Sequence, residues 1–357
     1  MFTRCALFAG FVALLAAVPN AAWAADPPKI SKPRPAPPIT PDTPPVTLPP
    51  AVFDPALAVG GDDVKAKKIE TRLSVDVQVN GRGPYRFIVD SGADTSAIGI
   101  EIARDLQLPL GTPALLNGMT SRDIVDRVMV DTLSLGPSSI SNVELPALRE
   151  VDMGGDGIIG IDALVQKRLM MDFEKKLIKV EDARTRYIPL PGEIVVTARR
   201  QRGQLILTHV LAAGLPLDAV IDTGTEITIG NLALRDQLIR GNRDKFVTVD
   251  VIGVTGETKK MQVARIAELQ LGPIILNDVP MAFADVPPFK LFGLADQPAL
   301  LLGTDLLETF RRISLDFRAR KVRFQLRRCK SQGFIISTDP DNFTRLSSTG
   351  SLDVCGP

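Results

Sequence analysis

The sequence predicts an all-β protein built from two tandem lobes, and three observations support this prediction. Two apolar residues followed by Asp, a hydroxyl residue and Gly occur at Ile88–Gly92 and again at Val220–Gly224, 132 residues apart. Alternating apolar and polar segments, typical of half-buried strands, lie around both copies. An apolar-apolar-Gly triplet follows each copy, at Ile158–Gly160 and at Leu301–Gly303. With two long units and no third, this order indicates a tandem duplication rather than a repeat array.

The residue types in the repeated motif indicate a shared pair of carboxylates. Ile88 and Val89 are typical of the end of a buried strand, which places Asp90 in a poorly hydrated position. If Asp222 lies beside it, both groups cannot ionise cheaply, and the pair holds a single proton. One member can then accept a proton from water while the other donates a proton to a carbonyl oxygen.

The residues after each Asp suit the same site. Ser91 and Thr223 offer hydroxyls that can bond the backbone where two lobes meet. Gly92 and Gly224 permit a tight turn and a close backbone approach. The alternative is ordinary turn chemistry, in which the Asp side chain bonds the backbone just ahead of it. One copy alone fits a turn, whereas two copies in matching apolar surroundings favour a shared site.

Residues 1–24 have the features of a secretory signal peptide. Arg4 supplies the positive end, and Ala6–Val18 is an apolar run too short to span a bilayer comfortably. Ala22–Ala24 fits a small-x-small cleavage site. We therefore expect an exported protein, periplasmic or secreted, with an uncleaved N-terminal membrane anchor as the alternative. No later stretch of the sequence is long and apolar enough to cross a membrane.

The rest of the chain divides by composition. Residues 25–64 are expected to form a Pro-rich linker, because proline is dense from Pro27 to Pro50, and a removable pro-segment is an equal alternative. The two lobes are predicted at residues 65–190 and 191–328, and residues 329–357 form a C-terminal tail.

Charge and histidine content exclude several kinds of partner and site. Without residues 1–24 the chain has 41 basic and 41 acidic residues, which argues against a nucleic-acid or anionic-membrane partner. The single histidine, His209, lies in an apolar strand-like run, where a buried structural imidazole is the expectation. One histidine leaves little for a zinc site or a Ser-His-Asp triad, so we expect neither a metal nor a cofactor.

Two cysteines remain after the predicted signal, Cys329 and Cys355. An even cysteine count in an exported chain is compatible with a disulfide. Pairing them would close a loop of about 25 residues and stabilise the tail by roughly 3 kcal/mol on the chain-entropy model.

These motifs together resemble the retropepsin-like aspartic proteases, in the clan that includes pepsin. The resemblance rests on Asp90–Ala93, on Asp222–Thr225 and on the two apolar-apolar-Gly triplets, and it covers roughly residues 65–328. It implies that each lobe is a small closed β-barrel with a short helix, and that the lobes are related by a pseudo-twofold axis. Because both lobes lie in one chain, it also implies a monomer.

The resemblance also implies roles for individual residues. Asp90 and Asp222 would be the catalytic pair that holds the lytic water, and Ser91 and Thr223 would interlock the two active-site loops. Asp94 and Glu226 would lie near the substrate backbone.

The same resemblance places Gly118 and Gly256 in hairpin flaps that close over a peptide, although a plain hairpin turn needs Gly just as much. Neither flap carries a tyrosine, which favours the retropepsin side of the clan. Thr225 stands where a small Ala or Ser is commoner, and the added charge of Glu226 is expected to raise the proton affinity of the pair.

The sequence therefore predicts an aspartic endopeptidase that hydrolyses peptide or protein substrates without metal or nucleic acid. The alternative is a non-catalytic peptide-binding or envelope-scaffolding protein on the same fold, since a fold alone does not secure catalysis. The Pro-rich segment and the Thr225–Glu226 departure motivate this alternative.

Overall fold

The computed structural model describes most of the chain between residues 29 and 347. The described ranges are 29–38, 63–69, 72–135, 138–164, 167–238, 246–327, 335–337 and 345–347. The predicted signal at residues 1–24 and both cysteines, Cys329 and Cys355, lie outside them. Among helices in the described part of the chain, none has the length and apolar character needed to cross a bilayer.

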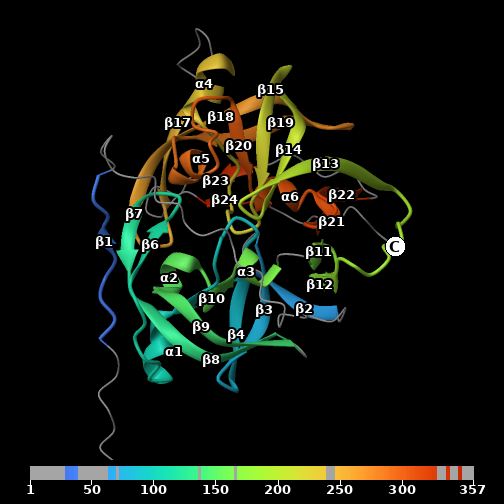
Figure 1. Ribbon diagram of the computed structural model, residues 1–357. Helices are drawn as coiled ribbons and strands as arrows, with labels where there is room; N and C mark the ends of the chain where they lie inside the picture. Colours follow the sequence, from blue (N-terminus) through green and yellow to red (C-terminus); the bar gives the residue numbers. More distant parts are fainter. Residues whose placement is uncertain are drawn as a thin grey trace, which may run out of the picture.

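The first lobe is a closed barrel of six strands (Figure 1). Pairing runs from β3 to β4, β10, β5, β9 and β8, and returns to β3. The barrel closes because β3 pairs with β4 along one edge and with β8 along the other. The six strands are β3 (Arg72–Val79), β4 (Arg82–Val89), β5 (Ala97–Gly99), β8 (Arg127–Leu135), β9 (Ser138–Leu148) and β10 (Gly157–Ile159).

The second lobe repeats this barrel strand for strand. Pairing runs from β14 to β15, β20, β16, β19 and β18, and returns to β14. The prediction of two tandem closed β-barrels is thereby confirmed. Its strands are β14 (Gln204–Ala212), β15 (Leu215–Ile221), β16 (Ile229–Gly230), β18 (Thr258–Leu271), β19 (Ile274–Phe283) and β20 (Ala299–Leu302).

Short helices occupy matching places in the two lobes, one after the first short strand and one on each side of the triplet strand. In the first lobe they are α1 (Ile100–Asp105), α2 (Glu150–Met153) and α3 (Ile161–Leu164). In the second lobe they are α4 (Leu232–Leu238), α5 (Pro287–Leu291) and α6 (Thr304–Leu307).

The hydrophobic pattern explains why each barrel closes around a core. Leu73, Val75, Val77 and Val79 alternate along β3 and are all at least 98% buried, as the period of two requires. The two-residue turn that follows has positive φ at both Asn80 and Gly81, the geometry that best matches the twist of a hairpin.

A third unit joins the lobes. Six antiparallel strands pair in the order β2, β12, β11, β21, β22, β13, and β11 and β21 meet at the centre. We call this unit the interlobe sheet. Its strands are β2 (Asp63–Ile69), β11 (Lys167–Asp172), β12 (Leu177–Asp182), β13 (Glu193–Gln201), β21 (Phe310–Asp316) and β22 (Lys321–Leu326).

Mirrored ion pairs fix the register at the centre of the interlobe sheet. Arg168 of β11 contacts Asp316 of β21 at 3.2 Å, and Arg312 of β21 contacts Asp172 of β11 at 2.6 Å. Both aspartates are buried, so each charge needs its partner, because breaking a buried pair leaves an uncompensated charge. The two halves of the chain are therefore held at one mutual position.

Two hairpins extend from the barrels over the space between them. The first consists of β6 (Ala114–Asn117) and β7 (Arg122–Val125), and the second of β17 (Val247–Ile252) with the first half of β18. We call them the first and second flaps. The remaining described strands, β23 (Ile335–Ser337) and β24 (Arg345–Ser347), pair with each other near the C-terminus.

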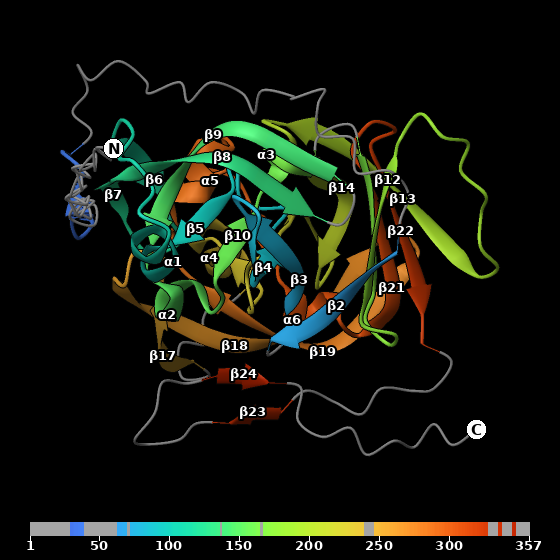
Figure 2. The ribbon, with the colours of Figure 1, turned by 90° about the horizontal axis from the view of Figure 1, so that it is seen from below.

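Part of the Pro-rich N-terminal segment lies against the first flap. Its strand β1 (Arg34–Pro35) pairs antiparallel with β7 and makes a three-stranded sheet, seen beside β7 in Figures 1 and 2. The amide of Ala36 donates to the carbonyl of Arg122 at 2.9 Å, the amide of Ser31 donates to Asp126 at 2.8 Å, and Ile30 is buried in the core. Residues 29–38 are thus an ordered part of the fold.

Deleting residues 29–38 is expected to speed hydrogen exchange in β7 several-fold, because β7 would become an unprotected edge strand with fewer buried contacts. Exchange measured by mass spectrometry on the variant and the intact chain checks this. The second flap supplies an internal control, since β1 pairs with β7 and not with β17. Unchanged exchange in β7, or an equal increase in β17, would contradict the expectation.

Candidate active site

Two parallel strand pairs deliver the predicted aspartates to the centre of the molecule. Asp90 follows the last residue of β4, and Asp222 follows the last residue of β15. In each lobe the triplet strand, β10 or β20, pairs in parallel with the strand that leads to the Asp. The amide of Asp90 donates to Ile159 at 2.9 Å, and the amide of Asp222 donates to Leu302 at 3.1 Å. Each triplet therefore supports the loop that carries one carboxylate.

The Gly at the end of each triplet is required by a close backbone approach. A Cβ at Gly160 would lie 2.6 Å from the carbonyl carbon of Thr95, and a Cβ at Gly303 would lie 2.5 Å from that of Ile227. Both distances are shorter than carbon atoms tolerate, so a side chain at either position would displace the loop after the Asp. The triplets thus hold both loops at matching positions.

The hydroxyls of Ser91 and Thr223 interlock the two loops, and we call these contacts the hydroxyl interlock. The hydroxyl of Thr223 accepts from the amide of Ser91 and donates to the carbonyl of Val89, each at 2.8 Å. The hydroxyl of Ser91 donates to the carbonyl of Ile221 at 3.0 Å and accepts from the amide of Thr223 at 3.2 Å. Because each loop completes the hydrogen bonds of the other, the two carboxylates are held together.

Backbone amides orient both carboxylates in the same way. Oδ1 of Asp90 accepts from the amides of Gly92 and Ala93 at 2.7 and 3.0 Å. Oδ1 of Asp222 accepts from the amides of Gly224 and Thr225 at 3.0 and 3.1 Å. The two loops therefore hold their carboxylates by the same pair of backbone contacts.

One contact breaks the symmetry of the pair. The hydroxyl of Thr225 donates to Oδ2 of Asp222 at 2.9 Å, and Ala93 at the matching position has no hydroxyl to offer. Asp222 therefore receives one more hydrogen bond from its own loop than Asp90 receives.

The two carboxyl groups lie against each other across the lobe boundary. A Cβ at Gly92 would contact the carboxyl of Asp222, and a Cβ at Gly224 would contact the carboxyl of Asp90, so both glycines are needed for this approach. Asp90 and Asp222 are within hydrogen-bonding reach of each other. The structure thus brings together all six residues that the sequence assigned to the pair and its loops.

The environment of the pair favours one shared proton. Burial, and then the negative charge of Asp222, raise the pKa of Asp90 to about 7. Burial also raises the pKa of Asp222, and the hydrogen bonds from Thr225 and Gly224 oppose that shift. The pair as a whole therefore favours a state with one proton and one negative charge.

Two side chains that sequence reasoning missed bind the predicted acidic residues from the opposite lobe. Arg72 of β3 forms a 2.7 Å ion pair with Glu226, and Gln204 of β14 donates to Asp94 at 2.5 Å. Burial raises the pKa of Asp94, and the Gln204 bond opposes that shift. Glu226 is held beside Arg72, whose positive charge lowers the pKa of Asp90. The positive charge of Arg72 therefore opposes the rise in proton affinity that Glu226 was expected to cause in the pair.

Two further carboxylates support the loops and also had no assigned role in the sequence. Asp162 accepts from the amide and hydroxyl of Ser96 at 2.9 and 2.8 Å, and Asp305 accepts from those of Thr228 at 3.0 and 2.7 Å. Burial raises the pKa of both, that of Asp305 to about 6. The signal was present in the sequence, since an Asp lies two residues after the Gly of each triplet.

A cavity of about 940 Å³ extends from the pair to the underside of the flaps. Its volume is at the upper end of the range for small-molecule and peptide pockets. Asp90, Asp222, Asp94 and Gly118 are among its lining residues, and Glu226 and Gly256 are not among them. The lining also includes a set of apolar side chains: Leu116, Met119, Val125, Ile158, Val254 and Leu291.

The flap tips meet each other above the cavity. The hydroxyls of Ser121 and Thr255 lie 2.8 Å apart, Met119 packs against the core of the second lobe, and Val254 packs against that of the first. Gly256 has a φ of +83°, which a turn at a hairpin tip requires. Gly118 and Gly256 both lie at the tips of these hairpins. Their contact with a substrate stays a prediction, as does that of Asp94 and Glu226.

A family model described as aspartyl protease matches the chain twice, over residues 75–163 and 208–306. The chain belongs to the aspartyl protease family. The two matches fall on the two barrels, so the chain is a two-lobed, retropepsin-like member of this family. No curated protein matches the chain.

Replacing Thr223 with Val is expected to destabilise the protein by about 1–3 kcal/mol, because the buried amide of Ser91 and carbonyl of Val89 would lose their partner. Denaturant unfolding checks the value. Thr248→Val is the control, since Thr248 is exposed on β17 and its replacement should change stability by less than about 0.5 kcal/mol. Equal stability of the two variants would contradict a structural role for the hydroxyl interlock.

Proposed function

We propose that this chain is an aspartic endopeptidase that uses Asp90 and Asp222 as its catalytic pair. The observation that carries the proposal is the mutual approach of the two carboxyls at the floor of an apolar cavity, each oriented by two backbone amides. The family supports peptidase chemistry, and the pair supplies the acid and base that such chemistry needs.

In the proposed mechanism a water molecule lies between the two carboxyls. The carboxylate of Asp222 accepts a proton from the water while the oxygen of the water bonds to the peptide carbonyl carbon. Asp90 donates its proton to the carbonyl oxygen, which gives a neutral tetrahedral diol and no covalent enzyme intermediate. As the diol collapses and the C–N bond breaks, Asp222 donates the proton it took from water to the leaving nitrogen. Asp90 takes a proton from a diol hydroxyl, which becomes the carbonyl oxygen of the acid product, and the pair returns to its starting state with one proton.

The shape of the cavity supports an extended peptide as the substrate. Both flaps and the strand ends border the cavity, so a peptide in it would find backbone partners on either side, as in strand addition. The apolar lining favours apolar side chains next to the cleaved bond. Because one chain supplies both carboxyls, a monomer suffices, and we propose that it acts outside the cytoplasm.

Asp90→Asn and Asp222→Asn are each expected to lower peptide cleavage by about 10²–10⁴-fold or more, because either change removes the acid–base partnership. Turnover of a fluorogenic peptide library by purified protein measures this. Asp131→Asn, an exposed position on β8, is the matched control and should retain full activity.

The same experiment separates the enzyme from the scaffolding alternative. Binding of an apolar, transition-state-like peptide inhibitor together with turnover supports the enzyme. Binding without turnover from acid to neutral pH, or full activity in either Asp variant, would overturn the proposed function.

The pH profile of kcat/KM is expected to be bell-shaped, with activity falling as pH rises through about 7, where the pair loses its shared proton. Thr225→Ala should move the acid limb to higher pH by about one unit, because the lost hydrogen bond stabilised the ionised form of Asp222. Thr225→Ser restores the hydroxyl and should restore the profile. An unmoved acid limb in Thr225→Ala would contradict this assignment.

A further inference from the structure

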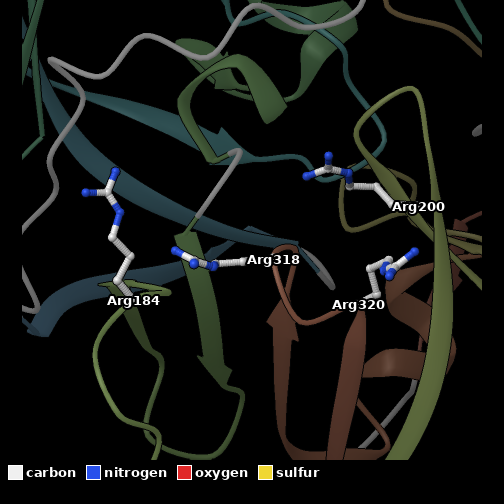
Figure 3. A pocket seen from close by; sticks show the side chains of 4 residues that line it. All are labelled: Arg184, Arg200, Arg318 and Arg320. Carbon is white, nitrogen blue, oxygen red and sulfur yellow. The ribbon is translucent and has the colours of Figure 1, made fainter.

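Among the residues that the structure describes, arginine side chains alone line a second hollow, which is distinct from the catalytic cavity. It has a volume of about 620 Å³ and is lined by Arg184, Arg200, Arg318 and Arg320. Figure 3 shows Arg318 between Arg184 on one side and Arg200 and Arg320 on the other. We call it the arginine hollow. None of its described lining residues also lines the catalytic cavity.

The fold brings these arginines together from three separate segments. Arg184 follows β12, Arg200 lies in β13, and Arg318 and Arg320 lie in the turn between β21 and β22. The amide of Ala198 donates to the carbonyl of Arg320 at 2.9 Å, which fixes that turn beside β13. Convergence of the four side chains is therefore built into one end of the interlobe sheet.

Three acids on β12, β15 and β21 are paired with arginines that do not line the hollow. Arg168 contacts Asp316 at 3.2 Å and Glu181 at 3.0 Å, and Asp218 is held by Arg199 at 2.9 Å. Among the described residues, the lining of the hollow contains no carboxylate. The overall sequence is close to neutral, with 42 basic and 41 acidic residues, so four arginines around one hollow are a local concentration of positive charge.

Guanidinium groups in such an arrangement suit phosphate chemistry. Four like charges around one space repel each other, and a multivalent anion relieves that repulsion. The planar fork of arginine donates two parallel hydrogen bonds to a phosphate, which makes it the preferred residue for this group. The hollow is within the volume range of small-molecule sites and exceeds what a single phosphate would fill.

We propose that the arginine hollow binds an anion that carries several adjacent phosphate groups. All four side chains are exposed, so the site is open to ligand from solvent without a change in the fold. Two sources share this chemistry: a free polyphosphate and the phosphate headgroups of a lipid surface. The proposal stands apart from the peptidase function and does not depend on it.

Isothermal titration of the intact protein with inorganic tripolyphosphate at physiological ionic strength tests the proposal. We expect one ligand per chain, and affinity at least about tenfold weaker in the double variant Arg318→Gln/Arg320→Gln. The charge-matched control is Arg82→Gln/Lys175→Gln, at exposed positions on β4 and in the β11–β12 turn. It should bind within about twofold of wild type. Thermal melts confirm that the variants fold.

Several outcomes would overturn the proposal. They are no binding of tripolyphosphate by the wild type, equal loss in the control variant, or equal binding of citrate, which would show general charge attraction rather than phosphate recognition. Vesicles with and without phosphatidic acid then distinguish the two sources. If the protein binds vesicles that contain phosphatidic acid but not vesicles that lack it, and Arg318→Gln/Arg320→Gln abolishes this binding, a lipid headgroup is supported. Binding of tripolyphosphate without vesicle binding supports a soluble ligand.

Discussion

The structure depends on the hydroxyl interlock between Ser91 and Thr223. Placing the two buried acids side by side is costly, because burial and the charge of Asp222 both disfavour ionisation of Asp90. The interlock offsets that cost with four hydrogen bonds that neither loop can complete alone. Burial makes these bonds expensive to break, so the lobes stay together where the chemistry would be done.

Contacts outside the interlock also hold the two lobes in one mutual position. The interlobe sheet fixes the mutual position of the two halves through paired buried charges. The apolar-apolar-Gly triplets support each Asp-bearing loop through a backbone hydrogen bond. Arg72 and Gln204 cross the boundary in opposite directions, each reaching the acidic residue beyond the opposite Asp. These contacts repeat in both lobes, which is what a duplicated sequence produces when its copies fold face to face.

The two lobes also differ in features that bear on function. Thr225 donates to Asp222 and Ala93 has no equivalent, so the two carboxyls are not interchangeable in their affinity for a proton. Residues 29–38 pair with the first flap alone. The arginine hollow gathers positive charge at one end of the interlobe sheet in a chain that is nearly neutral overall. Net charge alone therefore says little about local partners.

The sequence by itself determined the duplication, the all-β lobes and the identity of the paired motifs, because strand periodicity and motif chemistry are local properties of the chain. Only the tertiary structure decided that Arg72 and Gln204 cross the lobe boundary, that Asp162 and Asp305 support the loops, and that four arginines share one hollow. Those contacts join residues far apart in sequence. Local sequence patterns do not predict such contacts, because the side chains come together only when strands from separate segments pack.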